Sequence, residues 1–210
     1  MPPEPTTSQP SPPAPKRLGR PREFDEDEVL DAALDAFWRK GFEATSMADL
    51  IAATGLHKGS LYKAFGDKRS LFLATLRRYL DGGLAKLGET LAGKSSPRAK
   101  LDAWMGATLG SCDAADRRGC YAVNVEVELA PHDEEIAALI GAHFDRVGAL
   151  VTDVIAQGQE QGVFRTDRKA SELAEFLSVF AIGAVARSKG KLEASQAKRL
   201  ARSAIDAVLA

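Results

Sequence analysis

Residues 46–65 have the sequence SMADLIAATGLHKGSLYKAF, which predicts two short helices around a sharp turn. Thr45 or Ser46 would cap the first helix, with Asp49 in its first turn. Gly55 would end it, because a residue without a Cβ meets no steric penalty where the chain turns sharply. This pattern is typical of a helix-turn-helix.

The second of these helices would run from about Lys58 to Phe65. The apolar residues that would form the shared core are Ala48, Ile51, Ala52, Leu56, Leu61 and Phe65. The residues left pointing outward are Lys58, Gly59, Ser60, Tyr62 and Lys63. In a helix-turn-helix this end of the second helix enters the major groove, where lysine and serine can donate to bases or phosphate and tyrosine to phosphate.

The rest of the chain also predicts helices, about nine in all. Apolar residues recur every three or four positions over residues 29–37, and a long amphipathic stretch follows Asp133. A helix that opens at Asp67 would be weakened or bent by Gly82-Gly83. Residues 121–128 (YAVNVEVE) alternate as a strand would, but they have no second strand as a partner. The predicted fold class is therefore all-α.

The first 22 residues predict a disordered, proline-rich tail. Eight of the ten prolines lie between Pro2 and Pro21, so this segment can neither bury apolar surface nor form regular hydrogen bonds. Its end, KRLGRPR at residues 16–22, is a basic arm. Arg20 and Arg22 could lie in a DNA minor groove, or they could belong to a disordered basic linker.

The composition is that of an ordinary globular protein. Of 210 residues, 45% are hydrophobic and 27% are charged, and no stretch is long and apolar enough to span a membrane. The N-terminus does not look like a secretory signal, which leaves the cytoplasm as the expected location. The formal net charge is −1, but affinity for DNA phosphates depends on local basic clusters. Two cysteines are too few for a disulfide framework.

A longer block closely resembles the signature of the TetR/AcrR family of repressors. It is GFEATSMADLIAATGLHKGSLYKAFGDKRSLF, residues 41–72, and the match extends over about residues 24–76. The resemblance implies a homodimer that binds a palindromic operator in double-stranded DNA and is released by a small-molecule effector. It also implies a three-helix DNA-binding head over residues 23–69 and a helical effector-binding and dimerisation domain over residues 70–210.

The family pattern extends the set of candidate DNA-binding residues. Thr45 and Ser46 stand where the second family helix abuts the phosphate backbone, and Tyr62 and Lys68 match recurring phosphate contacts. The N-terminal amides of the helix at Lys68 can also meet a phosphate. The whole candidate set is Arg20, Arg22, Thr45, Ser46, His57, Lys58, Gly59, Ser60, Leu61, Tyr62, Lys63 and Lys68.

The family also implies an effector pocket in the C-terminal half, made of mostly apolar residues with a few polar groups. The candidates are Trp104, Thr108, Cys120, Tyr121, Asn124, His143, Phe144, Phe176 and Phe180. Each aromatic residue among them could equally belong to the core. His143 is not predicted to bind a metal, because no histidine or cysteine stands three or four residues away. No cofactor is expected.

A second, local resemblance concerns residues 119–131, GCYAVNVEVELAP. They resemble a Gly-Cys-x-x-x-Asn stretch of one subgroup of these repressors, in some of which the cysteine senses oxidants or electrophiles. Cys120 follows Arg117 and Arg118, and nearby cations lower a thiol pKa. Cys112 could then act as a resolving thiol. The alternative is a structural cysteine at the start of a helix.

The last two predicted helices, about residues 168–188 and 193–209, would form the dimer interface. Small residues along one flank, such as Ala181 and Gly183, permit close helix approach. Two such pairs about a two-fold axis make a four-helix interface.

Two rival classes are less consistent with the sequence. The chain has no G-x-S-x-G, H-E-x-x-H, P-loop or dinucleotide-binding glycine pattern, so an enzyme is not expected. An architectural DNA-binding protein would need basic surface throughout, whereas the C-terminal half is rich in apolar residues.

Overall fold

A computed structural model describes residues 24–110, 118–190 and 192–210, and these residues form nine α-helices and no sheet, as predicted. An isolated antiparallel bridge between Phe164 and Leu209 is the one strand-like pairing among them. The helices are α1 (Glu26–Lys40), α2 (Met47–Thr54), α3 (Lys58–Phe65), α4 (Lys68–Ala92), α5 (Pro97–Gly110), α6 (Tyr121–Leu129), α7 (Glu134–Glu160), α8 (Ala170–Ser188) and α9 (Ala194–Asp206).

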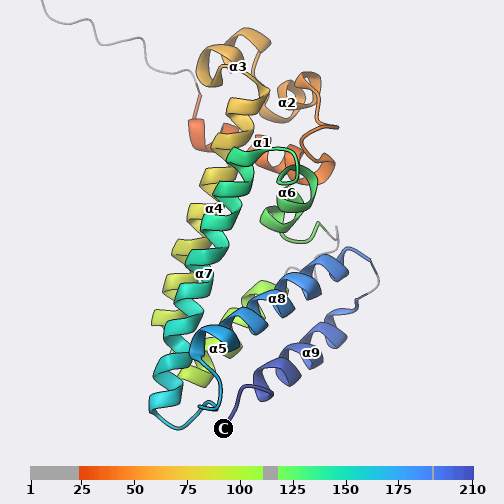
Figure 1. The fold of residues 1–210 in the computed structure, drawn as a ribbon. Coiled ribbons are helices and arrows are strands. Elements are labelled where there is room, and N and C mark those ends of the chain that lie inside the picture. The colour runs from red at the N-terminus through yellow and green to blue at the C-terminus, as the bar shows by residue number, and fades with distance from the viewer. Residues whose placement is uncertain (1–23, 111–117, 191) are drawn as a thin grey trace, which may run out of the picture.

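The molecule has a head at one end and a helical body at the other (Figure 1). Helices α1, α2 and α3 gather in the head, while α5, α8 and α9 pack together at the opposite end. Helices α4 and α7 lie side by side and connect the two ends. No described helix is both long and apolar enough to cross a membrane.

Local capping explains where the head helices begin and end. The Asp25 carboxylate accepts from the backbone N–H groups of Asp27 and Glu28, so it caps α1. Gly41 ends that helix with a φ of +81°. Of the two predicted caps, Ser46 and not Thr45 is the N-cap of α2, and it exchanges hydrogen bonds with Asp49 in a capping box. Gly55 ends α2 in the left-handed conformation.

Helix α4 does not break at Gly82-Gly83, where a weak point was predicted. It continues to Ala92, because Leu80, Leu84 and Leu87 on either side of the glycines are buried and hold the helix against its neighbours. The predicted domain boundary between residues 69 and 70 therefore falls inside a continuous helix.

Two hydrophobic clusters fill the interior. The body cluster joins the end of α4 with α5, α8, α9 and the second half of α7, and it contains Trp104 and Leu177. The head cluster joins α1–α3 with the first half of α4, α6 and the start of α7, and it contains Phe37 and Tyr121. Cys120 packs against both. The head thus shares its core with helices of the C-terminal half.

Candidate DNA-binding interface

The outward face of α3 is the candidate recognition surface. Its polar residues are exposed, as the sequence predicted: Lys58, Gly59, Ser60, Tyr62 and Lys63, with the N-cap residue His57 before them. The side chain of Tyr62 is 41% exposed, and the Lys58 Nζ lies 5.8 Å from the centre of its ring. This contact places an ammonium and a phenol together on one exposed turn.

Leu61 belongs to the inner face of the same helix. It is 1% exposed and packs in the head cluster, so the structure corrects its assignment as a DNA contact. Its burial instead fixes which face of α3 points outward. Because Leu61 turns one side of this short amphipathic helix toward the core, its neighbours Ser60 and Tyr62 lie on sides of the helix that are exposed to solvent.

The predicted inner face of α2 also needs correction. Leu50 is the residue that is fully buried, with Ile51 half-buried beside it, whereas Ala48 and Ala52 are exposed. The larger leucine removes more apolar area from water than either alanine, which favours this rotation of the helix.

Thr45 is buried as well and cannot offer its side chain to DNA in this conformation. Its hydroxyl donates to the Gly41 carbonyl and closes the loop between α1 and α2. Ser46, in contrast, is exposed at the N-terminus of α2. Lys40, 2.6 Å from Asp49, holds the pKa of that carboxyl far below its ordinary value, aided by hydrogen bonds from Ser46. The Asp49 carboxyl is therefore harder to protonate than an ordinary aspartate.

Lys68 lies at the start of α4, but its ammonium is turned toward the α1–α2 loop. The Nζ donates to the Glu43 carbonyl at 3.3 Å and lies 4.3 Å from the centre of the Phe42 ring. A phosphate contact by Lys68 would have to replace or share these interactions.

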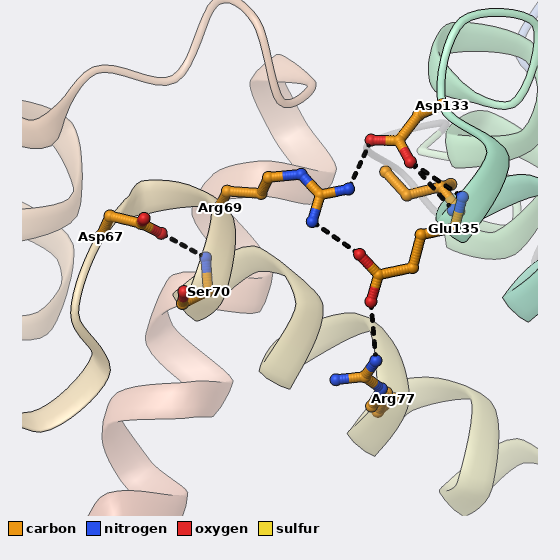
Figure 2. Close-up of polar contacts among 7 residues, drawn as sticks. Asp67, Arg69, Ser70, Arg77, Asp133 and Glu135 are labelled. Carbon is orange, nitrogen blue, oxygen red and sulfur yellow. Dashed lines mark hydrogen bonds and ion pairs between the residues drawn. The ribbon is translucent and has the colours of Figure 1, made fainter.

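Arginine–carboxylate pairs join the first turns of α4 to the start of α7 (Figure 2). The Arg69 guanidinium, at the start of α4, donates to Asp133 and Glu135 at 2.7 Å each, and Arg77 reaches the other oxygen of Glu135 at 3.0 Å. These hydrogen bonds lower the pKa of both carboxyls and raise that of Arg69. Asp67 caps the same end of α4 by accepting from the Ser70 backbone N–H at 2.7 Å.

The candidate effector residues do not converge on one pocket. Trp104 is buried in the body cluster, and Phe180 packs against that cluster, whereas Tyr121 is buried in the head cluster, against which Phe144 packs. Phe176 is 49% exposed on α8.

Tyr121 joins a group of aromatic rings between the head and α6. Its ring centre lies 5.4 Å from that of Tyr79 and 5.7 Å from that of Trp38. Burial raises the pKa of Tyr121 well above its usual value.

Two polar candidates remain half-buried on their helices. Thr108 lies on α5. His143 lies on α7, where its Nδ1 has no hydrogen-bond partner among the described residues and burial lowers its pKa.

The Gly119–Asn124 stretch has a structural role in this conformation. Gly119 has a φ of +69°, and an added Cβ would lie 3.1 Å from the Lys189 side chain. The Asn124 amide donates to the Arg118 carbonyl at 2.8 Å and accepts from the Lys189 Nζ at 3.0 Å. The stretch therefore joins α6 to the end of α8 instead of leaving the Asn124 amide facing a pocket.

Of the two cations that precede Cys120 in the sequence, Arg118 contacts α1, and Arg117 lies outside the described residues. The Arg118 guanidinium donates to Asp35 at 2.6 Å and stacks 4.7 Å from Trp38, both on α1. The Cys120 Sγ instead lies 3.5 Å from the Tyr79 hydroxyl. Cys112, the predicted resolving thiol, and the arm residues Arg20 and Arg22 lie outside the described residues.

Comparison with known proteins decides the family. Residues 29–75 match the family model described as bacterial regulatory proteins, tetR family, and residues 97–205 match the model described as tetracyclin repressor-like, C-terminal domain. The chain belongs to the TetR family. It is a DNA-binding transcription regulator with a helix-turn-helix, which confirms the interpretation of residues 24–76.

Individual TetR-family relatives match most of the chain. The HTH-type transcriptional repressor ComR of Escherichia coli is 33% identical over 165 residues, covering 78% of this chain and 79% of that protein. The uncharacterized HTH-type transcriptional regulator YezE of Bacillus subtilis is 32% identical over 167 residues, covering 77% and 84%. A cysteine mutant of the TetR family regulator CifR, solved with a 26bp operator DNA, has a TM-score of 0.79 at 28% identity, covering 90% of this chain and 99% of that one.

Two contributors to this TetR-family head were not predicted from the sequence. Arg69 links α4 to α7, and Glu128 of α6 accepts a hydrogen bond from the Glu43 backbone N–H, 85 positions earlier. Helical periodicity predicts neighbours three or four residues apart, so it gives no signal for pairs so distant in sequence.

Proposed function

We propose that the protein is a transcriptional repressor that binds a palindromic operator as a homodimer and is released by a small-molecule effector. The observation that carries the proposal is the exposed polar face of α3 beside the capped N-terminus of α2. The repressor function of relatives such as ComR supports it. The function is one of binding and not of catalysis, and it is exercised in the cytoplasm.

The proposed DNA contacts come from four places: α3 with its N-cap, the N-terminus of α2, the start of α4 and the N-terminal arm. Lys58, Gly59, Ser60 and Lys63 would meet base edges and phosphates in the major groove, while Ser46, His57 and Tyr62 would meet phosphates. Lys68 would add a phosphate contact, and Arg20 and Arg22 would lie in the neighbouring minor groove. The proposed DNA-binding domain is residues 23–69, preceded by the tail and arm of residues 1–22.

The outer face of α8 supports the proposed dimer. Val179 is 63% exposed, and together with Phe176 and Phe180 it lines an open groove of about 490 Å³ flanked by Glu172 and Glu175. Large apolar residues gathered on one exposed face are typical of a subunit interface. Leu200 of α9 is 45% exposed and would extend the same interface in a two-fold arrangement.

The proposed effector site lies in the C-terminal domain, residues 70–210. Its candidate residues are divided between the two clusters in this conformation: Trp104 and Phe180 pack in one and Phe144 in the other. Thr108 and His143 are half-buried on α5 and α7. A mostly apolar effector with one polar group would suit this set, and His143 Nδ1 would supply the hydrogen bond.

Selection of duplexes from a random-sequence pool tests the DNA-binding part of the proposal. We expect the wild-type protein to enrich an inverted repeat, and we expect Lys63→Ala to bind the enriched duplex more weakly at the same salt concentration. Failure to enrich any sequence would refute specific operator recognition. A thermal-shift screen of small molecules, followed by release from the enriched duplex, tests the effector part.

A further inference from the structure

The loop between α1 and α2 is held from two sides by charged side chains. Glu128, near the end of α6, accepts from the Glu43 backbone N–H at 3.0 Å. Lys68, at the start of α4, donates to the carbonyl of the same residue at 3.3 Å. Both polar groups of one backbone position are thus bound by side chains of opposite charge from two other helices.

Gly41 makes room for this arrangement. An added Cβ there would lie 2.8 Å from each of the two Glu128 carboxylate oxygens. The carboxylate of a long side chain can swing away from such a clash, but doing so would take it from the Glu43 N–H. The positive φ of Gly41 adds a second reason why glycine fits this position.

The loop leads directly into the DNA-binding elements. Thr45 follows the bound Glu43, hydrogen-bonds back to Gly41, and is succeeded by Ser46, the exposed N-cap of α2. The orientation of α2, and of α3 packed on it, therefore depends on the path of residues 41–46.

We propose that Glu128 is a positioning residue for DNA binding, which acts through the Glu43 peptide to hold the head in its binding conformation. This inference rests on the proposed recognition of a specific operator. A residue of the C-terminal half would thus affect operator affinity without contacting DNA.

The proposal predicts a change in DNA affinity opposite in sign to the change expected from the negative charge of Glu128 alone. Removing a carboxylate from a DNA-binding protein reduces repulsion of phosphates and ordinarily strengthens binding. Loss of a positioning residue weakens binding, because the head must then be ordered when DNA binds. The sign of the change in affinity therefore separates the two roles.

The test compares three variants of the full chain: Glu128→Ala, Glu128→Gln and Glu126→Ala. The probe is a duplex enriched by the wild-type protein from a random-sequence pool. We expect Glu128→Ala to raise Kd about fivefold to tenfold, the size expected when one solvent-exposed hydrogen bond to a backbone N–H is lost. Glu128→Gln keeps an acceptor oxygen and should fall between Glu128→Ala and wild type. Glu126→Ala removes an equal charge from the same helix and should not raise Kd.

Amide hydrogen exchange of the DNA-free protein supplies a second readout. The Glu43 amide should exchange faster in Glu128→Ala than in Glu126→Ala, at matched thermal stability. A Glu128→Ala variant that binds the duplex as tightly as wild type, or more tightly, would overturn the proposal, as would unchanged exchange of the Glu43 amide. If the wild-type protein enriches no duplex, the proposed function fails, and the exchange measurement still tests the loop contact.

Discussion

Replacing Gly158 by alanine tests how α7 packs on the chain that follows it. An added Cβ would lie 3.1 Å from Cγ of Phe164 and closer still to Cδ2 and Cε2. Phe164 is fully buried, so its ring cannot move aside into solvent. Overpacking a filled core costs about 1–3 kcal/mol, and a ring without room to move favours the upper end. Alanine is preferred over glycine inside a helix by up to about 1 kcal/mol. The expected net loss of stability is therefore about 2 kcal/mol.

The assay is thermal unfolding at a fixed protein concentration, since the Tm of a dimer depends on concentration. For a chain of this size, a loss of about 2 kcal/mol lowers Tm by about 4–8 °C. Gly82→Ala is the matched control, because Gly82 lies in α4 and an added Cβ there meets nothing within 4 Å. We expect that control to be as stable as wild type or about 1 kcal/mol more stable. A Gly158→Ala protein with an unchanged or higher Tm would refute the argument from packing.

Three further predictions concern the interfaces. Tyr62→Ala should weaken binding to the enriched duplex at least severalfold while leaving helicity and dimerisation intact; unchanged affinity would contradict the proposed orientation of α3 on DNA. Phe176→Glu should yield monomers in sedimentation at micromolar concentration, since it places a charge in the proposed apolar interface; a stable dimer would exclude this face. Arg69→Gln should weaken the acid dependence of stability. In the wild-type protein the folded-state pKa values of Asp133 and Glu135 are lowered, so these carboxylates stabilise the fold above their unfolded-state pKa values of about 4. That stabilisation is lost as pH falls through the folded-state pKa values. Equal acid-unfolding curves for the variant and wild type would contradict it.

The outward face of α3 could be predicted because the large apolar residues of its sequence are confined to one side of the helix. In KGSLYKAF, Leu61 and Phe65 are the large apolar residues that share one face, so the remaining side chains must point outward. The faces of α2 could not be assigned in the same way. MADLIAAT is apolar nearly all round, and only contact with α1 and α3 selects Leu50 over Ala48 and Ala52 as the buried residue.

The candidate effector residues show a second limit. Their spacing identifies helix faces but not which helices meet, and that depends on the path of the whole chain. Tyr121 and Trp104 therefore fall into different clusters, although each lies on an apolar face as expected. Family resemblance has a similar limit at Thr45, because the pattern assigns a position while the loop geometry decides that its hydroxyl turns inward to Gly41.

The packing of the head against α6 constrains how an effector can act. Because α6 contributes to the head cluster and also binds Lys189 of α8 through Asn124, a change that moves α6 must break contacts on one side or shift the head. By linkage, an effector that lowers operator affinity by some factor must bind the operator complex more weakly by the same factor. In a variant that lacks the Glu128 contact, part of the protein would already be in a conformation of low operator affinity before any effector binds. We therefore expect Glu128→Ala to bind operator less tightly and also to show a smaller further loss when the effector is added.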